Sequence, residues 1–338
     1  MMKAYELRSF SGIGGILPVQ RPRPAPGPRQ VLVRIKAVSL NYRDLMISKG
    51  IYNPRLPLPR VPLSDGAGEV IEAGPDVTRF CPGQRVAGIF MQDWLDGPLT
   101  EAKARSALGG ERDGVLAEYV SFPEDGLVAG PEHLTDEMAA TLPCAAVTAW
   151  NALAESGRVR PGDVVLTLGT GGVSLFALQF ATLMGARVIV TSGSDEKLER
   201  ARRLGAWGGV NYRREPQWHR RVLELTGGRG VDHVIELGGA GTLPESLGCV
   251  TYGGRISLIG VLTGGGEFNP IPLLMRHVGL QGIFVGSRAM FENMNRAVAQ
   301  HGLTPVVDRV FAFDQVHEAL AYMESAAHFG KIVVRVAG

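Results

Sequence analysis

Cysteine is scarce in this chain of 338 residues, which has only Cys81, Cys144 and Cys249, with no C-x-x-C pair among them. Proteins that rely on a disulfide framework or on cysteine-rich zinc clusters carry several closely spaced cysteines. Both kinds of framework are therefore excluded. The same scarcity fits a reducing compartment, and we expect the protein to be cytoplasmic.

Long apolar runs and an excess of one charge are also missing. No stretch reaches the roughly 18 apolar residues of a membrane-spanning helix, and the first residues lack the apolar run of a signal peptide. The net charge is +2, from 35 basic and 33 acidic residues. The densest basic clusters, at 200–203, 213–214 and 219–221, are interpreted mainly as solvated helix faces. We therefore expect neither nucleic acid nor a membrane as a partner.

The chain is long enough for two domains and a sizeable core, since 45% of its 338 residues are hydrophobic. Residues 1–125 contain short strand-like segments between Gly/Pro turns, a pattern typical of a twisted β-barrel-like domain. These segments lie at 30–38, 66–73, 84–90 and 115–120. The proline-rich residues 18–28 are expected to form an extended surface connection.

Residues 126–300 alternate between strands and helices. Strands are expected near Val164, Val188, Val231, Arg255 and Leu280, with helical stretches between them. This alternation predicts an α/β fold with a doubly wound parallel sheet. A short strand is also expected at 210–212, and a helix at 195–204 with Ser194 as its N-cap. The strand at 330–336 should rejoin the first domain, which about 301–338 would complete.

A glycine-rich turn lies between an apolar run at 164–168 and a helical pattern at 173–184. Its residues are Gly169, Thr170, Gly171, Gly172, Val173 and Ser174. Residues without a Cβ let the backbone approach a pyrophosphate, and the helix N-terminus adds free N–H groups and a positive dipole end. Ser174 replaces the last glycine of G-x-G-x-x-G with another small residue. A second strand at 185–191 completes the context, which predicts a dinucleotide site at residues 169–173.

Several motifs occur together in one order. They are VSLNYRDL at 38–45, DGAGEV at 65–70, LPCAAVTAW at 142–150, the glycine turn and GKIV at 330–333. With these motifs the chain resembles the medium-chain dehydrogenase/reductase superfamily over essentially its whole length, within the zinc-free quinone-oxidoreductase-like branch. The resemblance implies a GroES-like catalytic domain, a Rossmann domain, a cleft between them, and a homodimer or homotetramer.

The resemblance also indicates where zinc ligands would stand. Alcohol dehydrogenases of the superfamily hold a catalytic zinc with Cys, His and Cys, and the matching residues here are Asn41, Ser64 and Cys144. A catalytic zinc needs three protein ligands, which one thiol cannot supply. Asp65 stands where those enzymes have a glutamate beside the metal. The lobe that would hold a structural zinc, 91–114, contains no cysteine, so we expect no metal at either place.

The end of the second Rossmann strand bears on the choice of nicotinamide cofactor. NAD-selective relatives carry an acidic residue where this chain has Ser192, so a 2′-phosphate would not be repelled here. Asp195 lies further on, in a helix turn that favours an acid for its own dipole reasons. In the zinc-free family, Ser, Lys and Tyr at the positions of Ser192, Lys197 and Tyr212 recognise NADPH. The resemblance thus implies NADP(H).

Without a metal, hydride transfer suits a substrate that needs no Lewis acid, such as a quinone or a conjugated carbonyl compound. Asn41 is the candidate donor to the oxygen on which charge develops. Tyr42 and Tyr52 are candidates to bind substrate or to deliver a proton. For Tyr52, packing of its ring against Pro54 is the alternative, and solvent could then be the acid.

Other residues at family positions are expected to frame the cofactor, several through their backbone. They are Thr148, Gly238, Ile259, Gly260, Phe284, Val285, Ser287 and Arg288. For Arg288, a surface arginine at the start of a helix is the alternative.

The expected function is therefore NADPH-dependent, zinc-independent reduction of quinones or α,β-unsaturated carbonyl compounds. An enoyl-thioester reductase and an NADPH-binding subunit without turnover remain as alternatives. No Tyr-x-x-x-Lys pair occurs, so a short-chain dehydrogenase active site has no support. The physiological substrate stays open at this point.

Overall fold

The structure, a computed structural model, describes residues 1–336, which form two compact units. The first unit consists of Met1–Val147 and the segment from Gly286 onward, and the second is Thr148–Val285. The sequence places these boundaries at 125/126 and 300/301 instead. The difference arises because helix α3 (Asp136–Ala139) contacts strands of the first unit, and α10 (Arg288–Gln300) contacts its strand β7 (Leu127–Ala129).

The first unit is built on a seven-stranded sheet with the order β14-β15-β3-β4-β5-β7, in which β6 also pairs with β3. Its strands are β3 (Gln30–Ser39), β4 (Asp65–Ala73), β5 (Arg85–Gly88), β6 (Tyr119–Pro123), β7, β14 (Val307–Ala312) and β15 (Lys331–Arg335). Most neighbours are antiparallel, whereas β14 and β15 are parallel. The pairing of β15 with β3 confirms that the C-terminal strand rejoins the first unit.

A two-stranded sheet of β1 (Met2–Leu7) and β2 (Ile16–Arg21) corrects one sequence expectation. Residues 18–21 were expected in an extended connection, but they pair with β1 in the register Tyr5 to Pro18. Proline is tolerated there because β2 is an edge strand with one unpaired side. The short 3₁₀ helix η1 (Gly12–Gly15) connects the two strands.

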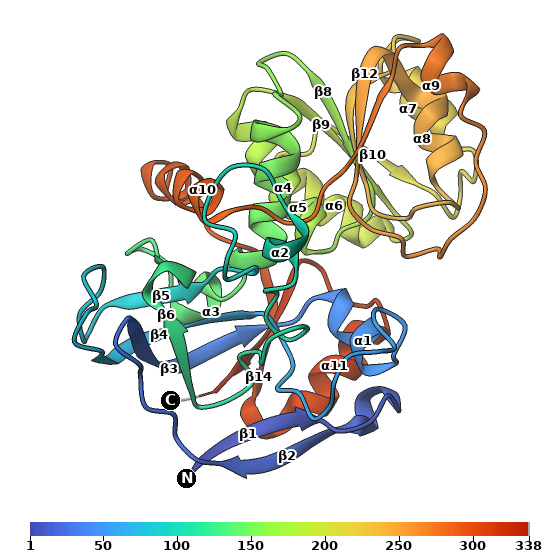
Figure 1. Cartoon of the computed structure of the whole chain (residues 1–338). Helices are drawn as coiled ribbons and strands as arrows, with labels where there is room; N and C mark the ends of the chain where they lie inside the picture. Colours follow the sequence, from blue (N-terminus) through green and yellow to red (C-terminus); the bar gives the residue numbers. More distant parts are fainter. Residues whose placement is uncertain (337–338) are drawn as a thin grey trace. The chain divides into compact units, whose positions relative to one another are not determined.

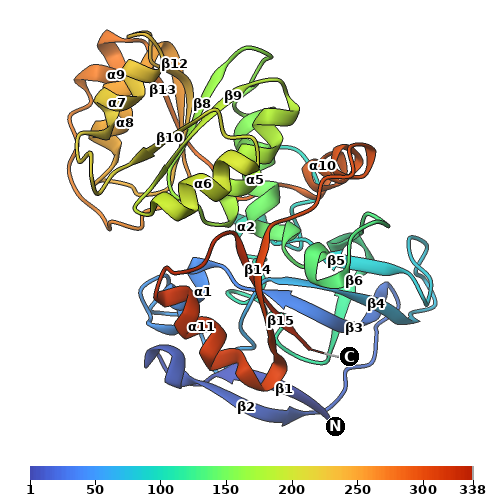
Figure 2. The same cartoon turned by 180° about the vertical axis from the view of Figure 1, so that it is seen from behind.

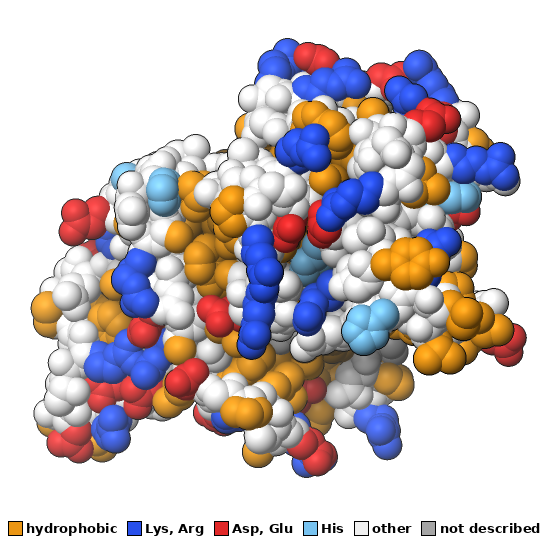
Figure 3. Space-filling model, turned by 90° about the horizontal axis from the view of Figure 1, so that it is seen from above, with side chains coloured by type: hydrophobic (Ala, Val, Ile, Leu, Met, Phe, Trp, Pro, Cys, Tyr) orange, Lys and Arg blue, Asp and Glu red, His pale blue; other side chains and the backbone are white. Residues whose placement is uncertain are grey.

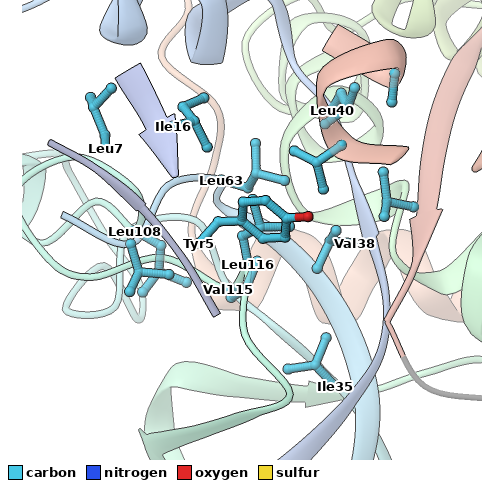
Figure 4. Close-up of a cluster of buried hydrophobic side chains, with 14 of the residues drawn as sticks. Tyr5, Leu7, Ile16, Ile35, Val38, Leu40, Leu63, Leu108, Val115 and Leu116 are labelled. Carbon is cyan, nitrogen blue, oxygen red and sulfur yellow. The ribbon is translucent and has the colours of Figure 1, made fainter. Parts of the chain in front are cut away.

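Helix α11 (Val316–Glu324) lies against α1 (Tyr42–Ser48) and against β15, as both ribbon views show (Figures 1 and 2). Buried side chains from β1, β3 and the segments around Leu63 and Val115 form one apolar cluster (Figure 4). The shorter helices of this unit are α2 (Glu101–Ala104), η2 (Glu124–Gly126), α3, the π-helix η3 (Leu142–Ala146) and η5 (Phe313–Gln315). This cluster fixes the starts of α1, β4 and β15, which carry the polar residues described below.

The second unit is a six-stranded parallel sheet with the order β10-β9-β8-β11-β12-β13. Its strands are β8 (Val164–Thr167), β9 (Arg187–Ser192), β10 (Gly208–Asn211), β11 (Val231–Glu236), β12 (Val250–Leu258) and β13 (Gly279–Gly282). This is the classic Rossmann order, so the predicted α/β fold class is confirmed. In such sheets, ligands bind beyond the carboxyl ends of the strands, where the strand order reverses. Here that point lies between β8 and β11.

Helices cover both faces of the parallel sheet. The helices α5 (Gly172–Leu183) and α6 (Asp195–Arg203) lie on one face (Figures 1 and 2). The other face is covered by α7 (Trp218–Leu225), α8 (Leu243–Cys249) and α9 (Ile271–Met275). The unit begins at α4 (Val147–Trp150) and the π-helix η4 (Asn151–Glu155). No helix within residues 1–336 has the length and apolar character to cross a membrane.

Charged side chains of both signs are mixed on the face drawn in Figure 3, where Asp and Glu stand among Lys and Arg. This distribution agrees with the nearly balanced charge of the sequence.

Candidate functional site

The glycine turn joins β8 to α5 in the second unit. Gly169 has a φ of 75°, in the left-handed region that favours glycine. A Cβ at Gly169 or Gly171 would meet no atom within 4 Å, so the space beside the turn is open. Gly171 is the N-cap of α5, and no side chain caps the helix. The turn therefore fits a pyrophosphate held by backbone N–H groups and the helix dipole.

Two hydroxyl groups hold this turn in place. The Ser174 hydroxyl donates a 2.6 Å hydrogen bond to the carbonyl of Leu168 and is completely buried. The Gly169 N–H donates to Thr191 Oγ1 at 3.2 Å. Ser174 thus ties the first turn of α5 to the end of β8, which explains why a serine serves at the last position of the motif. Thr170 is also buried.

The end of β9 begins the region expected to recognise the adenosine ribose. Ser192 is buried, and its hydroxyl accepts from the N–H of Ser194 at 3.2 Å. The Ser194 hydroxyl accepts from the N–H of Lys197 at 3.3 Å, so the predicted N-cap of α6 is confirmed. Asp195 accepts from Asn211 Nδ2 at 2.8 Å and forms an ion pair with Arg214. The Asp195 carboxylate is therefore already engaged.

Gly193 leaves room for two side chains over the end of β9. A Cβ at Gly193 would lie 2.9 Å from the Tyr212 hydroxyl and 2.8 Å from Arg213 Nε. Tyr212 also donates its N–H to the Ser192 carbonyl at 3.1 Å. Within residues 1–336, no ion pair links Arg213 to a carboxylate, in contrast to Arg214. Arg213 is thus a candidate ligand for an anion that sequence reasoning assigned to a solvated face; its position next to Tyr212 was the available signal.

A buried carboxylate organises the loop after β11. Glu236 is fully buried, and its Oε1 accepts from the N–H groups of Gly238 and Gly239 at 2.8 and 3.1 Å. Oε1 also accepts from the Thr242 hydroxyl, and Oε2 accepts from the Ser246 hydroxyl. A Cβ at Gly260 would lie 2.5 Å from the carbonyl oxygen of Leu237, so the loops after β11 and β12 approach through backbone. Sequence reasoning named Gly238, Ile259 and Gly260 but missed Glu236.

Three further predicted cofactor residues lie near the two ends of the second unit: Thr148, Phe284 and Val285. Thr148 is buried in α4, and the carbonyl of Val285 accepts from Asn151 Nδ2 at 2.7 Å. Phe284 is partly exposed. Their roles toward a cofactor stay predictions.

The start of α10 belongs to the first unit. The Ser287 hydroxyl caps this helix by accepting from the Met290 N–H at 3.2 Å. Arg288 forms a 2.9 Å ion pair with Asp125, and its guanidinium also donates to the Asp125 carbonyl. The guanidinium of Arg288 is therefore engaged within its own unit, a contact that the sequence does not reveal.

Five polar residues meet in the first unit, and we call them the polar cluster: Asn41, Ser64, Asp65, Cys144 and Lys331. The Ser64 hydroxyl donates to Asp65 Oδ1 at 2.7 Å, and the Cys144 N–H donates to Asp65 Oδ2 at 3.2 Å. Asn41 Nδ2 lies 3.5 Å from Ser64 Oγ. Lys331 Nζ donates to Asn41 Oδ1 at 2.7 Å. The cluster thus joins the starts of α1, β4 and β15 to η3.

Burial dominates the electrostatics of these groups. It raises the pKa of the Asp65 carboxyl, an effect that Lys331 and hydrogen bonds from Ser64 and Asn41 oppose. Burial also raises the pKa of the neighbouring Asp44 to about 6, against the lowering effects of Arg43 and the Asn41 N–H. The pKa of the Cys144 thiol is raised by burial and further by the nearby Asp65 carboxylate. The thiol is therefore protonated at neutral pH.

These donors do not fit a zinc site. A zinc ligand must offer a lone pair, and a cysteine ligand must be a thiolate. Of the three matching positions only Cys144 has a usual zinc ligand, and the Asn41 amide oxygen faces an ammonium group instead of an open position. Among the described residues 1–336, no group of three or more His, Cys, Asp or Glu side chains is placed to hold a metal ion.

The two candidate tyrosines follow Asn41 in the chain. Tyr42 is the first residue of α1, and Tyr52 lies in the loop after this helix. Tyr42 and Tyr52 are 47% and 39% exposed, so solvent or substrate can reach both side chains. The Arg43 guanidinium lies 5.2 Å from the centre of the Tyr52 ring and 4.4 Å from that of Phe90. Partial loss of hydration raises the pKa of Tyr52, against the effect of Arg43, so its side chain is a neutral phenol at physiological pH.

Comparisons with known proteins agree with this architecture. The family described as alcohol dehydrogenase GroES-like domain matches residues 27–132, and that described as zinc-binding dehydrogenase matches residues 172–300. A zinc-type alcohol dehydrogenase-like protein of Schizosaccharomyces pombe is 49% identical over 316 residues, which are 91% of each chain. A crystal structure of a putative alcohol dehydrogenase from Sinorhizobium meliloti 1021 has a TM-score of 0.92 and 45% identity, covering 99% of each chain.

Other relatives carry names that point to reductases. A quinone oxidoreductase of Pseudomonas aeruginosa is 36% identical over 259 residues, 75% of this chain and 73% of the relative. An acryloyl-coenzyme A reductase of Metallosphaera sedula is 29% identical over 344 residues, 98% of this chain and 99% of the relative. The GroES-like unit, the Rossmann order of the second sheet and these matches lead to one conclusion. The chain is an oxidoreductase and belongs to the medium-chain dehydrogenase/reductase superfamily.

Proposed function

We propose that the protein is an NADPH-dependent, zinc-independent reductase of quinones or α,β-unsaturated carbonyl compounds. The polar cluster is the observation that carries this proposal. Where zinc-dependent relatives have metal ligands, this chain has an amide whose oxygen accepts from Lys331 and whose NH₂ group, with two N–H donors, lies 3.5 Å from Ser64 Oγ. A donor without a metal suits a substrate whose negative charge spreads over a conjugated system.

Residues of the second unit would hold the cofactor. The turn Gly169–Val173 offers backbone N–H groups for the pyrophosphate, and Ser192, Lys197 and Tyr212 are proposed to bind the 2′-phosphate. Arg213 joins them because its guanidinium lies beside Tyr212 over Gly193. When bound, the reduced nicotinamide supplies the hydride. The residues after β11 and β12, Thr148 and the segment 284–288 remain proposed further contacts.

The first unit would bind and activate the substrate. Asn41 Nδ2 donates a hydrogen bond to the carbonyl oxygen, which gains negative charge as the double bond is reduced. Tyr52, a neutral phenol, is proposed as a proton donor, with Tyr42 as the second candidate and solvent as the alternative acid.

An enoyl-thioester reductase is the second candidate function, because a relative that aligns with 98% of this chain is named acryloyl-coenzyme A reductase. Both functions reduce a conjugated carbonyl compound. They differ in the substrate, because the second function requires a thioester. A third reading, an NADPH-binding subunit without turnover, predicts binding alone.

We also propose a cytoplasmic homodimer or homotetramer. The family resemblance supports the assembly, and the scarcity of cysteine supports the compartment. Light scattering on the purified protein measures the mass of the assembly. A monomer at micromolar concentration would contradict this part of the proposal.

One experiment separates these functions. Purified protein is given NADPH or NADH with cyclohexenone, 1,4-benzoquinone or crotonyl-coenzyme A, and loss of the reduced cofactor is followed by absorbance. We expect turnover with NADPH and an enone or quinone. Preference for the thioester would favour the second function. Binding of NADPH without turnover of any substrate would favour the third, and stoichiometric zinc by elemental analysis would overturn zinc independence.

A further inference from the structure

Asn41 occupies the N-cap of α1, where it forms a capping box with Asp44. Asparagine is favoured at this position because its side-chain oxygen accepts from the first free N–H groups. In the reciprocal half of the box, the Asn41 N–H donates to the Asp44 carboxylate at 2.8 Å. Besides this cap, the oxygen of the Asn41 side-chain amide has a second partner.

Lys331 takes up the oxygen end of that amide. Its ammonium group is buried, with the residue only 4% exposed, and donates to Asn41 Oδ1 at 2.7 Å and to the Leu40 carbonyl at 2.5 Å. An ammonium group has three donors and no acceptor. Only the oxygen of the amide can face it, so the NH₂ group must point away from Lys331, on the side of Ser64.

The charge of Lys331 is compensated inside the fold. A buried ammonium is costly unless it is paired and hydrogen-bonded. The Asp65 and Asp44 carboxyls are both buried and interact with this charge. The Leu40 carbonyl oxygen and Asn41 Oδ1 accept hydrogen bonds from the ammonium group. A cation that binds an amide oxygen also withdraws electrons from the N–H groups of the same amide, which makes them stronger donors.

We propose that Lys331 is a positioning residue that orients the Asn41 amide and strengthens its N–H donor toward the substrate oxygen. This inference rests on the proposed function, in which Asn41 binds the reacting carbonyl group. Lys331 acts through Asn41 and makes no contact with substrate itself. Without Lys331, the amide can rotate and present its oxygen, which repels a developing negative charge.

Three variants of the full-length protein test this role by steady-state kinetics with NADPH and cyclohexenone. Lys331→Met should lower kcat roughly 10- to 100-fold, the loss of one charge-assisted hydrogen bond, while the NADPH Kd stays within about twofold. Asn41→Ala should lower kcat by a similar factor. The double variant should be no slower than Asn41→Ala, because the two residues act as one unit. Multiplicative losses in the double variant would overturn the proposal.

Two further variants serve as control and as safeguard. Lys49→Met removes an exposed lysine from the other end of α1, where it pairs with Glu324, and should leave kcat unchanged. Asn41→Asp keeps the pairing with Lys331 but displays no N–H group, so it should be as slow as Asn41→Ala even if Lys331→Met does not fold. An active Asn41→Asp enzyme would overturn the proposal.

A readout without turnover distinguishes this inference from the proposed function. In protein labelled with ¹⁵N at asparagine side chains, the Asn41 amide signal, assigned by its loss in Asn41→Ala, should shift strongly in Lys331→Met and remain in place in Lys49→Met. An unchanged signal in Lys331→Met would refute the positioning role. A wild-type protein that reduces no substrate in the panel would instead refute the proposed function.

Discussion

Replacing Arg213 by Gln should weaken the binding of NADPH and leave the binding of NADH unchanged. The Arg213 guanidinium and the Tyr212 hydroxyl lie over Gly193, at the end of β9 where the ribose of a dinucleotide is bound in Rossmann units. The only expected difference between the two cofactors at this place is the 2′-phosphate. Glutamine keeps a polar side chain of similar reach and removes the charge.

The expected magnitude follows from the exposure of the residue. A hydrogen bond to a charged group contributes about 1.5–3 kcal/mol. Arg213 is exposed, so solvent and salt screen its charge, and we expect the lower end of that range. About 1.5 kcal/mol corresponds to a roughly 10-fold rise in the Kd for NADPH.

Two matched variants sharpen the interpretation. Arg214→Gln removes the neighbouring arginine, whose guanidinium already pairs with Asp195, and should change the NADPH Kd by less than about twofold. Gly193→Ala would place a Cβ within 3 Å of Tyr212 Oη and Arg213 Nε. The ends of these flexible side chains can shift at little cost in stability, so this variant should weaken NADPH binding while the protein stays folded.

Fluorescence titration of NADPH and NADH at fixed low salt measures all four proteins. Equal losses for both cofactors in Arg213→Gln would refute a contact with the 2′-phosphate. An Arg214→Gln loss as large as that of Arg213→Gln would show that general positive charge, and not the position of Arg213, is responsible. Wild-type protein that prefers NADH would refute the choice of NADPH itself.

Three further predictions concern single side chains. Lys197→Ala should weaken NADPH selectively, by about 1–3 kcal/mol in the same titration, and equal weakening of NADH would contradict a phosphate contact. Ser174→Ala removes the buried bond to the Leu168 carbonyl and should lower the free energy of unfolding by about 1–3 kcal/mol in chemical denaturation; an unchanged stability would refute this structural role. Because the pKa of Asp44 rises from 3.8 to about 6 on folding, the protonated form stabilises the fold at low pH, and this contribution is lost as the pH rises through about 6. Asp44→Asn should therefore gain up to roughly 3 kcal/mol relative to wild type between pH 4 and pH 8, and a difference independent of pH would refute the shift.

Local patterns in the sequence were sufficient for much of the architecture. The strand, glycine turn and helix at 164–183 and the Ser194 cap were predictable because hydrophobic periodicity, turn residues and caps act between near neighbours. The resemblance of motifs then indicated the GroES-like unit, and the return of β15 to β3 agrees with it. Asn41 and Ser64 were recognisable because they stand at motif positions that other family members fill with metal ligands.

Such local patterns could not predict contacts between segments that lie far apart in the sequence. Lys331 follows Asn41 by 290 residues, and only the pairing of β15 with β3 brings the two side chains together. Likewise, no local signal placed Glu236 beneath the loop that it organises, or the guanidinium of Arg288 against Asp125.

The sequence by itself thus determined the alternation of strands and helices in the second unit and the glycine turn, because each depends on residues within a few positions of one another. The resemblance of motifs added the replacement of the zinc ligands. The tertiary structure alone decided which end of the Asn41 amide faces a cation and which arginine lies over Gly193. Those choices depend on where packed strands and helices bring remote side chains. Burial also sets the charge states of Asp44 and Cys144, and burial is a property of the folded chain.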